Sequence, residues 1–446
     1  MKPGIPKGTR DFGPTEVRKR NYIFNIIKKV FTKYGFDSIE TPVMENLQTL
    51  TGKYGEEGDK LLFKVLNNGD YLAKADQQAL EERNSGKLTS SISKRGMRYD
   101  LTVPFARFVV MHQNDLAFPF KRYQIQPVWR ADRPAKGRYQ EFYQCDVDVI
   151  GSKSLMYEAE LCFIYDEIFT ALGLDVEIRI NNRKILAGLA AFVGIEDKFQ
   201  DMTVAIDKLD KIGEDGVIKE MSNRGIPEDA AKTVLQLIAQ KDLDQFEETL
   251  KEQELAMEGI AELKKVYAYL SSKDMNNAVV FDPCLARGLN YYTGAIFEVV
   301  GLNVNMGSLG GGGRYADLTS IFGLKDMSGV GVSLGAERIY DVMLEKDLFP
   351  NDLDKGLDLL IVAMDEDAHD FGFTKLGQLR AAGIRAELYP EPAKMKKQMK
   401  YANARQAKYA AIIGSEELKN EQFSLKNMDT GDQKLVDIDE LIKTLA

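Results

Sequence analysis

Strand-forming sequence in this chain is interrupted by one long helical block and then resumes. Residues 185–275 are charged, mostly acidic and helical in pattern, as in DLDQFEETLKEQELAMEGIAELKKVYAYL. Strand-like sequence returns abruptly with VVF at 279–281 and AIFEVV at 295–300, and we expect these two segments to pair as a hairpin. We therefore expect one sheet-based domain formed by residues 1–184 and 276–345, with the helical block as an insertion.

The C-terminal quarter of the chain follows a different pattern. A junction at 346–356 carries Pro, Asn and Asp, which is typical of a linker. Beyond it, strand-like segments alternate with helical ones at 366–382 and 394–405. This alternation predicts a small α/β domain at 356–446 with a largely parallel sheet.

Composition disfavours several kinds of protein. The 446 residues include two histidines and three widely separated cysteines, which leaves little room for a histidine-based triad, a multi-histidine metal site, a disulfide scaffold or a zinc ribbon. The N-terminus has no apolar signal-peptide core, and no apolar run is long enough to span a membrane. These features predict a cytoplasmic protein. A net charge of −9 disfavours non-specific nucleic-acid binding but allows a local basic surface.

Residues 119–150 are predicted to form two strands joined by a basic loop. Between residues 121 and 138, one acid, Asp132, stands among six cations: Lys121, Arg122, Arg130, Arg133, Lys136 and Arg138. Guanidinium groups donate paired hydrogen bonds to phosphate oxygens, so a hairpin with such a tip would suit phosphate binding. The alternative is a solvated hairpin tip with no ligand.

Three shorter segments each allow a functional and a structural interpretation. MRYDLTV is predicted to be a strand, so Asp100 and Thr102 would share one of its faces. There they would either hold an ammonium group or simply form a polar outer surface. The four glycines at 310–313 suit either close approach of backbone or ligand, or a flexible turn. GVGVSLGAER at 329–338 predicts a strand of small residues entering a helix, with room for a flat ring under Arg338.

KMKKQMKYANARQAKYAA, at 394–411, concentrates positive charge. It has six basic residues and no acid between Lys394 and Lys408. In an acidic chain, this concentration favours contact with a nucleic-acid backbone. A solvated basic helix is the alternative.

These segments occur in an order that is similar to that of one enzyme family. YGFDSIETPV at 34–43, the unit at 128–148 containing VWRAD and GRYQEFYQCDVD, and GVSLGAERI at 331–339 resemble the three motifs of class II aminoacyl-tRNA synthetases. RGLNYYTG at 287–294 and GGGGRYADL at 310–318 resemble the signatures specific to histidyl-tRNA synthetase. The resemblance extends over essentially the whole chain, from KGTRDF near the N-terminus to the final α/β domain.

The resemblance implies both a fold and a reaction. The fold is α+β: an antiparallel-sheet catalytic domain with a helical insertion, dimeric through motif 1, and a C-terminal α/β anticodon-binding domain. In the reaction, the carboxylate of L-histidine attacks the α-phosphate of ATP, giving histidyl-adenylate and pyrophosphate, and histidine then passes to the 3′ end of tRNA(His). Mg²⁺ is expected with ATP, with no protein ligand assigned to it. Because a carboxylate is already ionised at neutral pH, this chemistry needs no catalytic histidine or cysteine.

The resemblance also implies roles for individual residues. Arg130 and Arg287 match two arginines that hold the α-phosphate, and the residues expected to bind ATP are Arg130, Asp132 and Arg338. The residues matched to histidine binding are Asp100, Thr102 and Gln144 at its α-amino group, and Asp148, Tyr291 and Tyr292 at its imidazole. A donating phenol and an accepting carboxylate suit imidazole, which offers one acceptor and one donor. The residues expected to contact tRNA are Lys394, Lys396, Lys397, Lys400 and Arg405.

The match is less direct at a few positions. Asn290 stands where the family pattern RGLDYY has Asp, which puts a charge-based role there in doubt. Motif 2 has Asp132 in place of the usual Glu, with a shorter reach toward ATP. Adjacent residues of a strand face opposite sides, so Tyr291 and Tyr292 are not expected to reach one pocket equally, and Tyr292 is the better candidate.

Three alternatives stand beside this interpretation. A paralogue that keeps the fold without catalysis, such as the regulatory subunit of a histidine-biosynthetic phosphoribosyltransferase, usually lacks the C-terminal domain and the arginines, which are present here. A synthetase for threonine, proline or glycine is disfavoured by RGLNYYTG. A non-enzymatic tRNA-binding module would bind tRNA without activating any amino acid.

Overall fold

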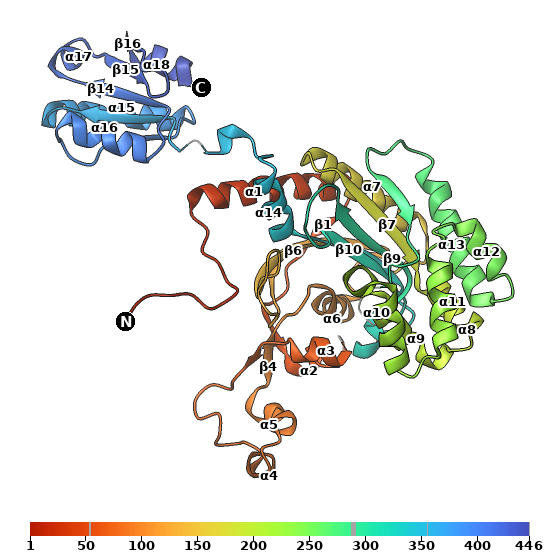
Figure 1. Ribbon diagram of the computed structural model, residues 1–446. Coiled ribbons are helices and arrows are strands. Elements are labelled where there is room, and N and C mark those ends of the chain that lie inside the picture. The colour runs from red at the N-terminus through yellow and green to blue at the C-terminus, as the bar shows by residue number, and fades with distance from the viewer. Residues whose placement is uncertain (53–54, 287–290, 355, 446) are drawn as a thin grey trace. The chain divides into compact units, whose positions relative to one another are not determined.

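The computed structural model describes residues 1–52, 55–286, 291–354 and 356–445. The chain forms two compact units: the larger contains Met1–Gly13 and Lys19–Leu348, and the smaller contains Pro14–Arg18 and the chain from Phe349 onward. Figure 1 traces both units by their position in the sequence. Among the helices of the described residues, none is both long and apolar enough to cross a membrane.

An eight-stranded sheet is the core of the larger unit. Its strand order is β1-β5-β6-β11-β10-β9-β7-β8. Neighbours from β5 to β7 are antiparallel, and only the edge pairs β1–β5 and β7–β8 are parallel, so the predicted antiparallel core is present. The strands are β1 Asp37–Ser38, β5 Phe120–Trp129, β6 Glu141–Ile150, β7 Val176–Asn182, β8 Ala278–Phe281, β9 Tyr292–Gly301, β10 Gly310–Tyr315 and β11 Gly329–Gly335.

Two long helices, α1 and α7, cover one face of this sheet. Phe31 of α1 packs on Tyr123 of β5 with the ring centroids 5.5 Å apart, and Glu160 of α7 accepts hydrogen bonds from Lys121 of β5 at 2.9 Å. Because side chains alternate along a strand, the intervening residues point to the opposite face, which is left for a site. The helices of this unit outside the insertion are α1 Pro14–Lys33 (from Lys19 onward), α2 Leu47–Leu50, α3 Gly55–Lys60, α4 Gln77–Glu81, α5 Ser85–Ile92, α6 Thr102–His112, α7 Met156–Ala171 and α14 Ala336–Glu345, with a 3-10 turn at Leu318–Phe322.

The predicted hairpin of β8 and β9 is wrong, because these strands do not pair with each other. Both lie against β7, with β8 parallel on one side and β9 antiparallel on the other. A parallel pair needs a crossover connection, and the helical block between β7 and β8 supplies it. The insertion therefore determines where β8 joins the sheet.

The residues between β7 and β8 are helical, as the sequence predicts. Gly188 of α8 and Gly259 of α13 let two of these helices pack closely: a Cβ at Gly188 would lie 2.4 Å from the Cβ of Ala256, and a Cβ at Gly259 would lie 3.0 Å from Ile185. The helices are α8 Arg183–Phe192, α9 Phe199–Ile206, α10 Leu209–Asn223, α11 Glu228–Ile238, α12 Leu243–Thr249 and α13 Glu254–Leu270, with a 3-10 turn at Glu196–Lys198.

The segment MRYDLTV is a strand only at its start, so Asp100 and Thr102 do not share a strand face as predicted. The strand β4 ends at Met97, and α6 begins at Thr102. Asp100 Oδ1 accepts a hydrogen bond from the backbone N–H of Val103 at 3.1 Å. This contact satisfies a donor in the first turn of α6 and so favours helix over strand. A separate three-stranded sheet joins β2 Met44–Asn46, β4 Arg95–Met97 and β3 Lys64–Val65.

The smaller unit has a five-stranded sheet in the order β13-β12-β14-β15-β16. β12, β13 and β14 are parallel, as predicted, whereas β15 and β16 form an antiparallel hairpin that the alternating pattern did not indicate. Leu376 and Leu379 of α15 pack on one face of the sheet and Ala402 of α16 on the other. A 3-10 turn at Asn351–Asp354 comes before the first strand of this unit. The elements are then β12 Leu359–Ala363, α15 Glu366–Ala381, β13 Ala386–Leu388, α16 Met395–Ala404, β14 Tyr409–Ile413, α17 Ser415–Lys419, β15 Phe423–Asn427, β16 Gln433–Val436 and α18 Ile438–Leu445.

Candidate active site

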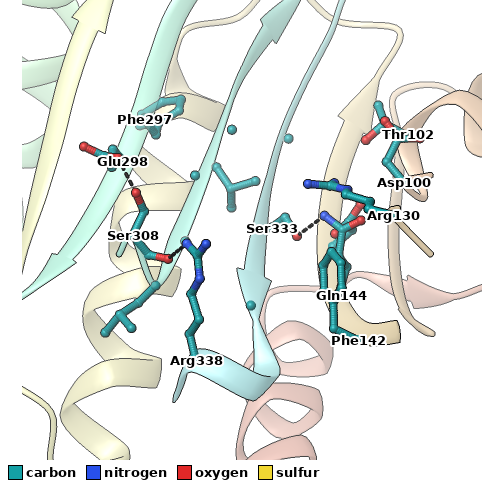
Figure 2. Close-up of a pocket in the computed structure, with 18 of the residues that line it drawn as sticks. Asp100, Thr102, Arg130, Phe142, Gln144, Phe297, Glu298, Ser308, Ser333 and Arg338 are labelled. Carbon is teal, nitrogen blue, oxygen red and sulfur yellow. Dashed lines mark hydrogen bonds between the residues drawn. The ribbon is translucent and has the colours of Figure 1, made fainter. Parts of the chain in front are cut away.

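A cavity of about 430 Å³ lies over the face of the central sheet that α1 and α7 leave uncovered. Residues of β6, β9, β10 and β11 line its floor, and residues of the β5–β6 loop and the start of α14 line its walls. Figure 2 shows side chains reaching into it from both sides. Every described residue that was predicted to bind histidine or ATP lines this cavity: Asp100, Thr102, Arg130, Asp132, Gln144, Asp148, Tyr291, Tyr292 and Arg338. Arg287 and Asn290 lie outside the described residues.

Glycines leave space for the buried groups at the floor of the cavity. The run at 310–313 lies within β10, in the middle of the sheet, and is not a flexible turn. A Cβ at Gly312 would lie 2.2 Å from the carbonyl oxygen of Gly331, and a Cβ at Gly331 would lie 1.9 Å from Asp148 Oδ1. The glycine run therefore serves close approach, which was the other interpretation of this segment.

Arg130 follows the last residue of β5 and is fixed on one wall of the cavity (Figure 2). Its Nε donates to the carbonyl oxygen of Tyr99 at 3.0 Å. Its guanidinium carbon lies 4.2 Å from the centre of the Tyr99 ring and 5.2 Å from that of Phe142. A guanidinium held in this way presents its remaining donors in a defined direction, which suits an anion.

The six cations of the 119–150 segment do not form a single basic tip. Lys121 and Arg122 point to opposite faces of the sheet, because they are adjacent on β5. Lys121 pairs with an acid of α7 at 2.9 Å, Arg122 is fully buried, and Lys136 pairs with an acid of α14 at 2.8 Å. Of the six, Arg130 and Arg138 line the cavity, so the phosphate-binding hypothesis is restricted to these two.

Arg338 stands on the opposite wall, in the first turn of α14 (Figure 2). Its Nε donates to the carbonyl oxygen of Gly137 at 2.8 Å and its Nη1 to that of Ser308 at 2.7 Å. The hydroxyl of Ser308 in turn donates to Glu298 of β9. Arg338 thus joins the β5–β6 loop to the segment before β10. Glu298 was not predicted, although a lone acid within the apolar strand AIFEVV is a pattern that could have found it.

Asp148 is a buried carboxylate with a fixed orientation. Arg122 Nη2 lies 2.7 Å from its Oδ2, and the hydroxyl of Tyr315 donates to its Oδ1 at 3.0 Å. The guanidinium carbon of Arg122 lies 4.3 Å from the centre of the Phe105 ring, which packs against it from α6. Burial raises the pKa of Asp148, and the positive charge of Arg122 opposes that rise. An ion pair from β5 and a hydrogen bond from β10 therefore set the direction of this acceptor.

Tyr291 and Tyr292 both line the cavity, and which of them would contact histidine more closely stays a prediction. β9 begins at Tyr292, and the alternation of a strand therefore does not apply to Tyr291. Their ring centroids are 4.9 Å apart in an edge-to-face arrangement. The hydroxyl of Tyr291 lies 3.4 Å from Asp100 Oδ2. Tyr291 thus connects the start of β9 to the residues before α6.

Asp146 is a cavity residue that the sequence interpretation missed. It stands between Gln144 and Asp148 on β6, so the three side chains share one face, and this spacing of two could have found it. Asp146 Oδ2 is 3.9 Å from Arg122 Nη2, and Gln144 Nε2 donates to Ser333 Oγ at 3.1 Å (Figure 2). Burial raises the pKa of Asp146 to about 7, and the charge of Arg122 acts in the opposite direction. One guanidinium therefore faces two buried carboxyl groups.

Comparison with known protein families gives two matches. The family described as histidyl-tRNA synthetase matches residues 70–339, which is more than half of the chain, and an anticodon-binding domain matches residues 358–446. The chain belongs to the histidyl-tRNA synthetase family. This assignment confirms the predicted class II synthetase fold, with an antiparallel catalytic sheet and a separate C-terminal domain.

Individual relatives agree with the family. A histidine–tRNA ligase of Bacteroides fragilis strain YCH46 is 53% identical over 100% of this chain and 99% of its own. One of Christiangramia forsetii is 53% identical over 99% of this chain and 98% of its own. The crystal structure of histidyl-tRNA synthetase from Nostoc sp. PCC 7120 has a TM-score of 0.81 at 30% identity and covers 100% of this chain and 99% of its own. An ATP phosphoribosyltransferase regulatory subunit/histidyl-tRNA synthetase from Bacillus halodurans C shares the fold, with a TM-score of 0.72 at 20% identity over 93% of this chain and 100% of its own.

In this member of the histidyl-tRNA synthetase family, the predicted tRNA-contact residues lie in the anticodon-binding domain. Five side chains at or beside α16 are exposed: Lys394, Lys396, Lys397, Lys400 and Arg405. Lys397 Nζ lies 3.1 Å from Glu391 Oε1, and Arg405 pairs with Glu387. Exposed ion pairs of this kind are weak and exchange readily with other anions. The basic surface of α16 is thus partly neutralised but open to a partner.

Proposed function

We propose that the protein is a cytoplasmic histidine–tRNA ligase, which activates L-histidine with ATP and transfers it to the 3′ end of tRNA(His). The observation that carries this proposal is one cavity lined both by a fixed guanidinium, Arg130, and by a buried, oriented carboxylate, Asp148. Relatives named histidine–tRNA ligase, matched over nearly their full lengths, support the same activity.

In the first step, the carboxylate of histidine attacks the α-phosphate of ATP and pyrophosphate leaves. The nucleophile is ionised at neutral pH, so the protein contributes position and charge and not a general base. Arg130 is proposed to stabilise the charge that collects on the phosphoryl oxygens, because its guanidinium is fixed before the reaction begins. Arg287 is proposed to hold the same phosphate, a role that rests on its match to the family pattern RGLxYY.

Selection of histidine is assigned to the inner part of the cavity. Imidazole has one donor and one acceptor, and Asp148 with a tyrosine hydroxyl can satisfy both. Asp148 is proposed to accept the imidazole N–H, since Arg122 and Tyr315 already hold it in place. Tyr291 and Tyr292 are proposed to supply the phenol. The residues proposed to hold the α-ammonium group are Asp100, Thr102 and Gln144, which line the same cavity.

ATP is proposed to lie between the two walls of the cavity. Arg338 would stack on the adenine ring in a cation–π contact, and Asp132, whose Oδ1 is 3.7 Å from Arg138 Nη1, would face the nucleotide. Among the described residues, no group of three or more His, Cys, Asp or Glu side chains is arranged to hold a metal ion. Mg²⁺ bound mainly through phosphates needs only one or two carboxylates, and Asp132 and Glu298 line the cavity and fit that role. When bound, the ion would neutralise phosphate charge.

The proposed enzyme is a homodimer that pairs through motif 1. Val43, the last residue of YGFDSIETPV, and Met44, which follows it, are 37% and 47% exposed, although both are apolar. Apolar side chains left in solvent beside this motif are suited to burial against a second copy. We assign the domains as a catalytic domain at 1–184 and 276–345, a helical insertion at 185–275 and an anticodon-binding domain at 356–446. The match of the anticodon-binding family from residue 358 supports the last of these boundaries.

The α16 surface is proposed to bind the tRNA backbone. The double change Lys396→Ala/Lys400→Ala removes two exposed cations and should weaken tRNA charging, because removing a cation that neutralises a phosphate lowers both the affinity for tRNA and its salt dependence. We expect the slope of log affinity against log salt to fall by about 1 for each cation removed. ATP–pyrophosphate exchange, which needs no tRNA, should be unchanged.

Lys419→Ala is the matched control, since Lys419 is an exposed cation of α17 in the same domain. It should leave charging and salt dependence as they are in the wild type. Unchanged tRNA charging in the double variant, or an equal loss in pyrophosphate exchange, would contradict the role given to α16.

A further inference from the structure

The N-terminal segment KGTRDF, at 7–12, has no part in the proposed reaction, yet it contacts the loop that carries residues of the ATP site. The carbonyl oxygen of Gly8 accepts a hydrogen bond from the backbone N–H of Gln140 at 2.8 Å, and that of Gln140 accepts one from Arg130 at 3.0 Å. Gly8 has a φ of +82°, and a Cβ there would lie 2.7 Å from Gln140 Cγ. The close approach and the backbone angle both require glycine. Gln140 thus links this segment to Arg130 through two backbone hydrogen bonds.

Arg10 adds side-chain contacts to the same loop. Its guanidinium carbon lies 3.8 Å from the centre of the Tyr139 ring, and its Nη1 donates to the Tyr139 hydroxyl at 2.9 Å and to Asp341 Oδ1 at 3.1 Å. The Tyr139 hydroxyl donates to Asp341 Oδ2 at 2.6 Å. Arg10, Tyr139 and Asp341 therefore form a closed set of three mutual contacts, and Tyr139 itself lines the cavity.

Both the N-terminal segment and the β5–β6 loop contact α14. Asp341 lies in α14 one turn after Arg338, and the ring of Phe12 meets that of Tyr340 edge to face with centroids 6.3 Å apart. Arg338 holds the β5–β6 loop at the carbonyl of Gly137. The loop is thus held to α14 at three points: by Arg338, by the exposed ion pair of Lys136 with Glu345, and through Tyr139 by Asp341 together with the N-terminal segment.

We propose that residues 8–12 form a strap that positions the β5–β6 loop for ATP, with Arg10 as its main positioning residue acting through Tyr139. This inference rests on the proposed function, because ATP is the ligand whose binding the loop would govern. A loose loop has to be ordered when ATP binds, which costs conformational entropy, whereas a strapped loop is ordered in advance. Histidine is proposed to bind mainly through strand residues such as Asp148 and Gln144, which the strap does not hold. Loss of the strap is therefore expected to affect ATP and not histidine.

Arg10→Ala in the full-length protein tests the strap through ATP–pyrophosphate exchange with histidine. We expect the KM for ATP to rise on the order of tenfold, which corresponds to about 1.4 kcal/mol, with the KM for histidine unchanged. Arg10→Lys keeps a charge beside Asp341 but loses the planar stacking on Tyr139, so it should fall between the wild type and Arg10→Ala. Lys7→Ala is the matched control, since Lys7 is an exposed cation just before the strap; both KM values should stay as in the wild type.

Tyr139→Phe is a second variant that keeps the ring for Arg10 to stack on and removes only the hydroxyl, which donates a hydrogen bond to Asp341 and accepts one from Arg10. It should raise the KM for ATP by less than Arg10→Ala does. If Arg10→Ala does not fold, the KM for ATP of Tyr139→Phe tests the strap in its place. An unchanged KM for ATP in the folded variants, or an equal rise in both KM values, would overturn the strap. A wild-type protein that shows no exchange with histidine would instead overturn the proposed function, so the two failures are distinct.

Discussion

Arg130→Ala is expected to lower the rate of histidine activation by about a hundredfold or more, because it removes the donor that we propose stabilises the charge developing in the transition state. The wild-type guanidinium is held by the Tyr99 carbonyl at 3.0 Å and lies over the Tyr99 ring, so it needs no rearrangement as the reaction proceeds. The side chain is only partly buried, and the variant should therefore fold normally. The measurement is kcat in ATP–pyrophosphate exchange at saturating histidine and ATP, together with the thermal unfolding midpoint.

Two further variants make the Arg130 result specific. Arg130→Lys keeps the positive charge but loses the planar fork, and should recover little activity. Arg133→Ala removes an exposed arginine three residues further along the same loop and should exchange like the wild type. The role of Arg130 is wrong if Arg130→Ala retains an exchange rate close to that of Arg133→Ala.

Asp148→Asn is expected to raise the KM for histidine by roughly 10- to 100-fold, which is the effect of losing a charge-assisted hydrogen bond of about 1.5–3 kcal/mol. The KM for ATP should change little, because Asp148 lies with Arg122 and Tyr315 away from the arginines of the walls. The same change leaves the fully buried Arg122 without its nearest counter-charge. We therefore expect the free energy of unfolding to fall by roughly 3 kcal/mol as well.

Glu158→Gln is the control that separates recognition from stability. Glu158 of α7 is a buried carboxylate paired with the nearly buried Arg314 of β10, as Asp148 is paired with Arg122, but it does not line the cavity. It should lower the free energy of unfolding without changing the KM for histidine. If both variants change stability and histidine binding in the same proportion, Asp148 acts through the fold and not by contact with histidine.

Local patterns in the sequence predicted which segments are helices and strands better than they predicted which strands pair. The periodicities of residues 185–275 and 366–405 are properties of consecutive residues, and the helices and strands found there follow them. β8 pairs with β7 because the helical insertion ends beside that edge of the sheet. The position of this end cannot be predicted from the pattern of consecutive residues. Asp100 shows the same limit at smaller scale, because its hydrogen bond to Val103 changes an expected strand into the start of a helix.

The candidate site could be predicted as far as matched motifs reach. Arg130, Gln144 and Asp148 are recognisable from their place in a motif, and the structure brings them to one cavity. The partners that orient them could not be predicted in this way. Arg122 looked like part of a basic surface, and its burial against Asp148 follows only from the register that places residue 122 of β5 opposite residue 148 of β6. Burial and register between strands distant in sequence are thus what the structure adds.

ATP–pyrophosphate exchange, with each amino acid offered singly to the wild-type protein, tests histidine activation most directly. Exchange needs only the amino acid, ATP and Mg²⁺, so it examines the cavity without the anticodon-binding domain or tRNA. We expect exchange with histidine alone, because an oriented carboxylate and a phenol can satisfy both nitrogens of the imidazole ring. An amino acid with a different side chain would leave one of these two buried protein groups without a hydrogen-bond partner. Exchange with a different amino acid, or with none, would contradict the proposed function.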